Sequence, residues 1–159
     1  AVDPLVYEAP SPFLMSAIGK AYLAFCSDWE RDAIIARLTQ SHRSADRLAQ
    51  DPSDLRRMLR GIRKAGYAIT GEDLRHMTEG LSASAGDARK RATGLAIPVL
   101  SHDRVIACLS LRFIRSVMTN SEAAGTYLKP LRQLAEEIAT AARRKSNPAL
   151  TFAEDDHVI

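Results

Sequence analysis

The chain has 159 residues, of which 22 are Lys or Arg and 19 are Asp or Glu, so its formal net charge at pH 7 is +3. This length is typical of one domain and suffices to bury a core without disulfides or a structural metal. The composition, 46% hydrophobic and 26% charged, excludes disordered, collagen-like and coiled-coil proteins. No apolar run reaches the roughly 18 residues of a membrane span. Two cysteines, Cys26 and Cys108, are too few for a disulfide framework, so we expect a cytoplasmic protein.

Positive charge is concentrated in the body of the chain. Residues 1–145 hold all 22 bases and 16 of the 19 acids, a net charge of +6. Three groups carry most of the excess: Arg56, Arg57, Arg60, Arg63 and Lys64; Arg89, Lys90 and Arg91; and Arg143, Arg144 and Lys145. Proteins that bind single-stranded nucleic acid stack bases on aromatic side chains. No aromatic residue is interleaved with these basic residues. They are therefore interpreted as solvated helix faces and chain ends, and a nucleic-acid surface is the less favoured alternative.

In chain order, residues 2–7 form a short β-prone stretch. Apolar residues recur at helical spacing from Met15 to Phe25 and predict the first helix. Ser27 and Glu30 have the spacing of a capping box, which predicts that a second helix begins there. A polar link over residues 39–50 follows it.

The third helix has a signal at each end. Asp51-Pro52 is an N-cap followed by proline at the first helical position, and Gly66 suits the position just after the last turn. Residues 67–70 then read as a strand that enters a long segment over 71–93. This segment holds three glycines and little periodicity, so it is interpreted as a long loop.

The clearest sheet signal is a hairpin of residues 95–100 and 105–113, turned around His102–Asp103. Thr119 and Glu122 form a second capping box. It opens a terminal helical region that extends to about residue 144.

This terminal region contains Pro130, which is expected to kink or split it. Its predicted apolar stripe consists of Leu131, Leu134, Ile138 and Ala141. Residues 146–159 are predicted to be a flexible C-terminal tail, and residues 1–145 one domain. Segregated helices and an antiparallel hairpin predict the α+β class, with an antiparallel sheet flanked by helices.

We find no constellation that would support catalysis. The four histidines are scattered over polar segments, and no Ser–His–Asp or Cys–His arrangement can be assembled from the predicted elements. No glycine-rich phosphate-binding motif occurs. We therefore expect a protein without enzymatic activity, metal or cofactor.

The strand at 105–113 has two different faces, because side chains alternate along a strand. Ser110 and Arg112 share one face, and a hydroxyl beside a guanidinium fork can hold a carboxylate. The alternative, which the pattern alone favours, is a half-exposed strand whose second face meets water. The two faces are Val105, Ala107, Leu109, Leu111 and Phe113, and Ile106, Cys108, Ser110 and Arg112.

A second candidate is the run of small residues that opens the first helix, Ser16 to Ala21. Unpaired backbone N–H groups at a helix start bind anions, and small side chains allow close approach. The alternative is tight packing of this helix on the sheet, with Lys20 directed to solvent.

Together these segments resemble the effector-binding domain of IclR-type bacterial transcription regulators. Residues 16–24, Ser-Ala-Ile-Gly-Lys-Ala-Tyr-Leu-Ala, look like the family signature A-x-G-K-A-x-L-A. Residues 62–68 resemble its I-R-x-x-G-Y helix end, and residues 95–99 its I-A-x-P-V strand, which residues 105–110 follow. Met118-Thr119 fits the start of the last helix. The order and spacing of these pieces over residues 12–144 carry the resemblance.

The resemblance implies a GAF/profilin-like domain that binds a small organic acid and forms homodimers or homotetramers. In the family, DNA is bound by an N-terminal winged helix-turn-helix. Residues 1–159 contain no such pattern, so DNA would be bound only through a domain absent from this sequence, and the first strands look short for the family. The remaining alternative is a stand-alone GAF-like small-molecule-binding module or a small enzyme.

Family ligand positions carry over as an expected effector site. Backbone amides at the signature helix fall at Ala17 and Ile18, and the polar residue after the G-Y strand falls at Thr70. The position before the I-A-x-P-V strand falls at Thr93 or Gly94. Two polar positions of the second hairpin strand fall at Ser110 and Arg112.

This sequence departs from the family at two of these positions. Thr70 stands where some members have Asp, and Arg112 where glyoxylate-type members have Ser, which argues against a very small, highly polar effector. The stretch from Phe13 to Met15 looks closest to the branch that controls aromatic-acid catabolism. A pocket of Phe13, Met15, Ile18, Gly94, Ala96 and Arg112 would suit an aromatic carboxylic acid.

Overall fold

A computed structural model of the chain describes residues 13–70 and 92–146. The predicted strand at 2–7, most of the predicted loop at 71–93 and the tail after residue 146 lie outside the described residues. Within residues 13–70 and 92–146, no helix is long and apolar enough to cross a membrane.

Three antiparallel strands form one sheet in the order β1-β2-β3, with β1 at Ala68–Thr70, β2 at Ala92–Ser101 and β3 at Arg104–Ile114. His102 and Asp103 both have positive φ, 50° and 58°, which is the conformation of a tight two-residue hairpin turn. The predicted hairpin is therefore confirmed. It begins earlier than expected, because Thr93 already belongs to β2.

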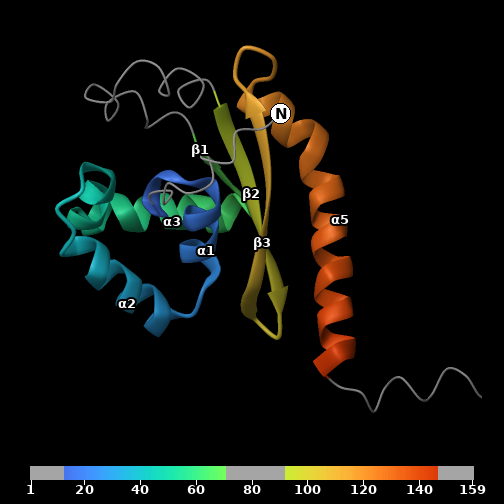
Figure 1. The fold of residues 1–159 in the computed structure, drawn as a ribbon, viewed down its shortest axis with the longest axis horizontal. Coiled ribbons are helices and arrows are strands. Elements are labelled where there is room, and N and C mark those ends of the chain that lie inside the picture. Colours follow the sequence, from blue (N-terminus) through green and yellow to red (C-terminus); the bar gives the residue numbers. More distant parts are fainter. Residues whose placement is uncertain (1–12, 71–91, 147–159) are drawn as a thin grey trace, which may run out of the picture.

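Helices cover both faces of the sheet (Figure 1). On one face, α1 (Ala17–Phe25) lies on the strands with α3 (Pro52–Ala65) beside it. The helix α2 (Asp28–Thr39) packs on the 3₁₀ helix η3 (Ser44–Gln50). Another 3₁₀ helix, η2 (Phe13–Met15), precedes α1. The long helix α5 (Asn120–Ser146) covers the other face. The α+β class, an antiparallel sheet flanked by helices, is confirmed.

The sheet separates two hydrophobic cores. Ala68 and Ala96 face α1 and α3, whereas Leu95, Ile97 and Val99 face α5 and are almost completely buried. This division follows from the alternation of side chains along β2.

Local end signals predicted α3 and α5 correctly. The Asp51 carboxylate accepts hydrogen bonds from the amides of Ser53 and Asp54, and Gly66 ends α3 with φ 78°. At α5, the Glu122 carboxylate accepts from the Thr119 amide while the Glu122 amide donates to Thr119 Oγ1. The helix continues through Pro130 and is not split there.

Three local predictions need correction. The helix α2 begins after Ser27 as predicted, but Ser27 makes no side-chain cap, and the Glu30 carboxylate accepts a hydrogen bond from the Tyr22 hydroxyl. The link at 39–50 contains η3, in which buried Asp46 accepts from Ser41 Oγ at 2.6 Å.

The third error concerns the inner face of α5. Leu134 is 45% exposed and Ala141 is also exposed, whereas Ala135 and Ala139 are buried against the sheet. Small residues therefore occupy the closest contacts of α5, and Leu134 lies at its margin.

Candidate functional site

Three of the predicted effector residues form a row across the sheet. Thr70 pairs with Gly94, and Gly94 pairs with Arg112. Adjacent strands lie about 4.8 Å apart, so this row spans about 10 Å of the sheet. The next row on the same face is Ala68, Ala96 and Ser110, which places Ser110 beside Arg112 on the face toward α1.

Gly94 lies directly under the start of α1. A Cβ built at this position would lie 3.7 Å from Ala17 Cβ and 3.4 Å from Thr70 Oγ1. The absence of a side chain therefore lets the start of α1 pack closely on β2 at this row. Thr70 Oγ1 accepts a hydrogen bond from the Gly94 amide at 3.0 Å, which fixes β1 against β2 at this point.

Thr93 does not join this row. By alternation its side chain lies on the face opposite to Gly94, and its hydroxyl donates to the Thr70 carbonyl within the sheet. Thr93 is 2% exposed. Of the two positions that the sequence left open, Gly94 is the one that lies beside Ala17.

The start of α1 supplies unpaired amides above the row. Ser16 caps the helix, and its Oγ accepts from the Gly19 amide at 2.9 Å. The amides of Ala17 and Ile18 have no acceptor within the helix, because the first turn of an α-helix has none. Their partial positive charge, added to the helix dipole, favours an anion at this point.

Gly19 is required by the contact between α1 and η2. A Cβ at Gly19 would lie 2.1 Å from the Phe13 carbonyl oxygen, a distance that no side chain can adopt. The glycine of the signature segment therefore lets η2 pack directly on the first turn of α1.

Two arginines hold the other end of α1. Arg31 donates to the carbonyls of Leu23 at 2.9 Å and Cys26 at 2.8 Å. Arg63 of α3 donates to the Ala24 carbonyl. These cationic donors satisfy carbonyls that a helix end leaves open, and they fix the axis of α1 over the sheet.

An apolar pocket of about 260 Å³ lies on the same face of the sheet, between α1, η2 and β3. Its lining residues are Phe13, Ser16, Ile18, Gly19, Tyr22, Ile106, Ala107 and Cys108. The Phe13 ring meets the Tyr22 ring edge to face, with 6.2 Å between the ring centroids. A larger hollow of about 760 Å³ lies beside α5, but its lining residues all belong to that helix.

The polar groups of this pocket stay neutral. The hydrogen bond to Glu30, together with burial, raises the pKa of Tyr22 to about 12. Burial raises the pKa of the Cys108 thiol to about 11. The pocket wall is therefore uncharged near pH 7 and suits an apolar group.

Most of the predicted residues thus converge on one side of the sheet. Phe13 and Ile18 line the pocket, whereas Gly94, Ala96 and Arg112, which were expected to line it, do not. Thr70, Gly94 and Arg112 share the row described above, Ala17 lies beside Gly94, and the side chains of Ser110 and Arg112 are exposed. Met15 is half-buried in η2 and is not among the lining residues, and Thr93 faces away.

Sequence reasoning did not include Tyr22, Ile106 and Cys108 in the site. Two signals were present. Ile106 and Cys108 share the strand face of Ser110 and Arg112, and Tyr22 lies one helical turn after Ile18.

Comparison with known proteins agrees with this architecture. The family model of the bacterial transcriptional regulator IclR C-terminal domain matches residues 9–140. The fold is similar to that of the Thermotoga maritima IclR, with a TM-score of 0.57 and 22% identity, over 81% of this chain and 46% of that one. It is also similar to the C-terminal domain of the Escherichia coli transcriptional regulator KdgR, with a TM-score of 0.57 and 22% identity, over 80% of this chain and 69% of that one.

A third similar structure is an IclR family transcriptional regulator from Brucella abortus, with a TM-score of 0.58 and 16% identity. The match covers 81% of this chain and 44% of the Brucella chain. The present chain therefore spans less than half the length of two of these relatives. Because the family model covers most of its residues, the chain belongs to the family of IclR-type transcriptional regulators, as their C-terminal domain.

Proposed function

We propose that this domain senses a small aromatic carboxylic acid and has no catalytic activity of its own. The acid's carboxylate is bound by Arg112, Ser110 and the amides of Ala17 and Ile18. Its ring occupies the apolar pocket beside them.

The proposal rests on two features that lie on one face of the sheet. The start of α1 borders an uncharged pocket of about 260 Å³, and Ser110 and Arg112 lie further along the same face of β3. A guanidinium fork and helix amides together favour a carboxylate. Small-molecule sites typically combine an apolar lining with a few convergent polar groups.

In the whole regulator, the effector would change which arrangement of subunits is populated, and hence the spacing of the DNA-binding domains. This requires that the acid bind the two arrangements with different affinities. We propose that the protein is cytoplasmic and acts as a homodimer or homotetramer, and that specific DNA contact belongs to a separate N-terminal domain.

Calorimetry with three related probes tests the proposal. We expect 3-phenylpropanoate to bind saturably, and both 3-phenylpropan-1-ol, which lacks the charge, and propanoate, which lacks the ring, to bind at least tenfold more weakly. Equal affinity for the acid and the alcohol would contradict the carboxylate site. Equal affinity for the two acids would contradict the aromatic pocket.

A further inference from the structure

Five cationic side chains share the outer face of α3. Successive residues of an α-helix are rotated by about 100°, which places all five within an arc of about 120°. Leu55, Leu59 and Ile62 lie on the opposite side and are buried in the core. We call this set the cationic stripe: Arg56, Arg57, Arg60, Arg63 and Lys64. Arg63 lies at its inner edge, where its Nε donates to the Ala24 carbonyl of α1.

The stripe is poorly neutralised. Like charges three or four residues apart destabilise a helix, and the stripe contains several such pairs. Arg57 is paired with Asp54 at 2.6 Å on the exposed surface. Within the described part of the chain, Arg60 and Lys64 make no ion pair or side-chain hydrogen bond. A stable fold does not require this arrangement, since glutamates at some of these exposed positions would give a more stable helix.

Gly61 lies beside the stripe, and no packing within the described residues explains it. A Cβ at Gly61 would have no atom within 4 Å. Glycine at an exposed helical position weakens the helix relative to alanine. A glycine there does allow the backbone of a partner to approach between Arg57 and Lys64, which lie one turn before and one turn after it.

We propose that the cationic stripe is a sequence-independent contact with the phosphates of duplex DNA. Arg56, Arg60 and Lys64 follow one another at about 6 Å along the helix axis. Duplex DNA presents a negative charge about every 1.7 Å of its own axis, so several cations can be neutralised at once. Such contacts need no aromatic residue, unlike the recognition of single strands.

The position of α3 suits such a contact. It lies on the face of the sheet that α1 covers (Figure 1), and its last turn meets α5, where Arg132 donates to the Ala65 carbonyl at 3.1 Å. Its cations do not line the effector pocket, so the contact is separate from effector binding. A protein of a transcriptional-regulator family works at high local concentrations of DNA, where a weak phosphate contact adds to specific binding elsewhere.

Fluorescence anisotropy with a labelled 30-base-pair duplex of random sequence tests this proposal. We expect the 159-residue chain to bind in 50 mM KCl and to release the DNA as the salt concentration rises. The double variant Arg60→Ala/Lys64→Ala should weaken binding at least tenfold. It should also reduce the slope of log affinity against log salt by about 1.8, since each phosphate contact contributes about 0.9.

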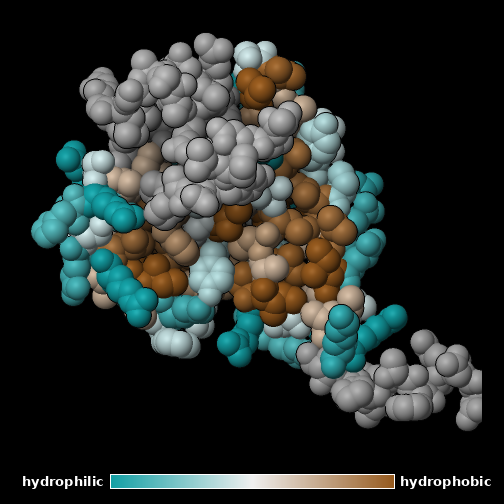
Figure 2. Space-filling model, in the orientation of Figure 1, coloured by the Kyte–Doolittle hydropathy of each residue, from teal (hydrophilic) through white to brown (hydrophobic). Residues whose placement is uncertain are grey.

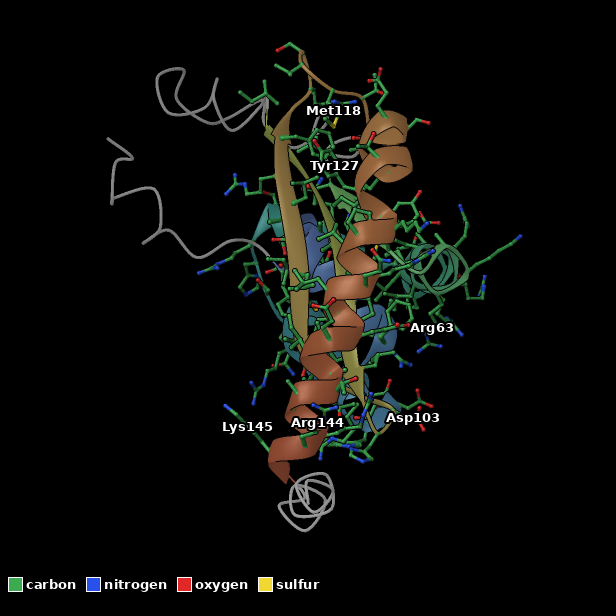
Figure 3. All side chains as sticks on the ribbon, turned by 90° about the vertical axis from the view of Figure 1, so that its right-hand side faces the viewer. Arg63, Asp103, Met118, Tyr127, Arg144 and Lys145 are labelled. Atoms are coloured by element: carbon green, nitrogen blue, oxygen red, sulfur yellow. The ribbon has the colours of Figure 1, made fainter. Side chains whose placement is uncertain are left out.

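Two further variants separate this contact from net charge and from folding. Arg144→Ala/Lys145→Ala removes the same charge from the end of α5 (Figure 3) and should change affinity less than twofold. Gly61→Gln keeps every cation and should weaken DNA binding at least threefold without lowering the melting temperature.

The proposal would be overturned by any of three results. These are no binding of duplex DNA by the wild type at 50 mM KCl, equal losses in the two double variants, or binding of polyglutamate as tight as that of DNA. The last result would assign the stripe to an acidic protein partner.

Discussion

At the scale of the residue, Arg112 is the side chain on which the proposed effector site depends. It lies on the α1-facing side of β3, opposite Gly94, and is exposed to solvent. Arg112→Ala should weaken binding of 3-phenylpropanoate at least about tenfold, because a hydrogen bond to a charged group contributes roughly 1.5 kcal/mol or more. Arg112→Lys should restore only part of the affinity, since an ammonium lacks the planar fork. Calorimetry measures all three proteins.

The control for this prediction is Arg104→Ala. Arg104 lies on the same strand at the hairpin end, is exposed, and carries the same charge. Its removal should leave affinity within twofold of the wild type. Equal affinity of Arg112→Ala and wild type would show that Arg112 is only a surface residue.

Cys108 determines part of the response of stability to alkaline pH. Burial raises its pKa from 9.0 to about 11, so the folded protein retains a proton that the unfolded chain releases near pH 9. The resulting stabilisation is complete below pH 9 and is lost as the pH rises through 11. Urea denaturation at pH 8.5 and 10.5 should show a smaller loss of stability in Cys108→Ala than in wild type. An identical loss would contradict this assignment.

At the scale of the element, α5 depends on its first turn. The reciprocal bonds between Thr119 and Glu122 satisfy two amides that the helix itself leaves open. Thr119→Ala should therefore lower the free energy of unfolding by about 1 kcal/mol in urea denaturation. Ser121→Ala, a neighbouring exposed substitution, should change it by less than about 0.5 kcal/mol. Similar losses in both variants would argue against a specific cap.

Elements whose ends are marked by local chemistry could be predicted from the sequence. The ends of α3 depend on Asp51 and Gly66, and the β2–β3 turn on two adjacent residues. Predictions failed where a tertiary contact competes with a local one. Glu30 has the spacing of a capping residue, but its carboxylate accepts a hydrogen bond from the hydroxyl of Tyr22, which belongs to another helix.

The same distinction holds for the candidate site. Strand alternation alone placed Ser110 and Arg112 on one face, and the register of β2 against β3 agrees. The pocket walls depend on how α1 packs across β3, which no local pattern encodes. For this reason Tyr22 and Ile106 were missed.

At the scale of the whole molecule, the proposed DNA contact uses phosphates, which carry no sequence information directly. Selection from a random duplex library with this chain alone should therefore enrich no sequence motif. An enriched motif would mean that this chain itself recognises a DNA sequence. It would contradict the proposal that specific DNA contact belongs to a separate domain.

Several large apolar side chains of the described residues are exposed at the molecular surface. Ile114 of β3 and Leu134 of α5 are 49% and 45% exposed, and Figure 2 shows hydrophobic side chains gathered over these two elements. Surfaces of this kind typically mark protein–protein interaction sites. Static light scattering at tens of micromolar should therefore give a mass of at least twice the monomer mass of 17.4 kDa.

A matched pair of variants identifies the surface responsible for this association. Ile114→Asp places a charge at the exposed end of β3 and should shift the protein toward monomer. Trp29→Asp makes a comparable change on α2, where Trp29 is 74% exposed, and should leave the mass unchanged. A monomeric wild type would contradict self-association of this domain. An unchanged mass in Ile114→Asp would exclude the β3 surface, because a charge buried without a partner in an interface strongly opposes association.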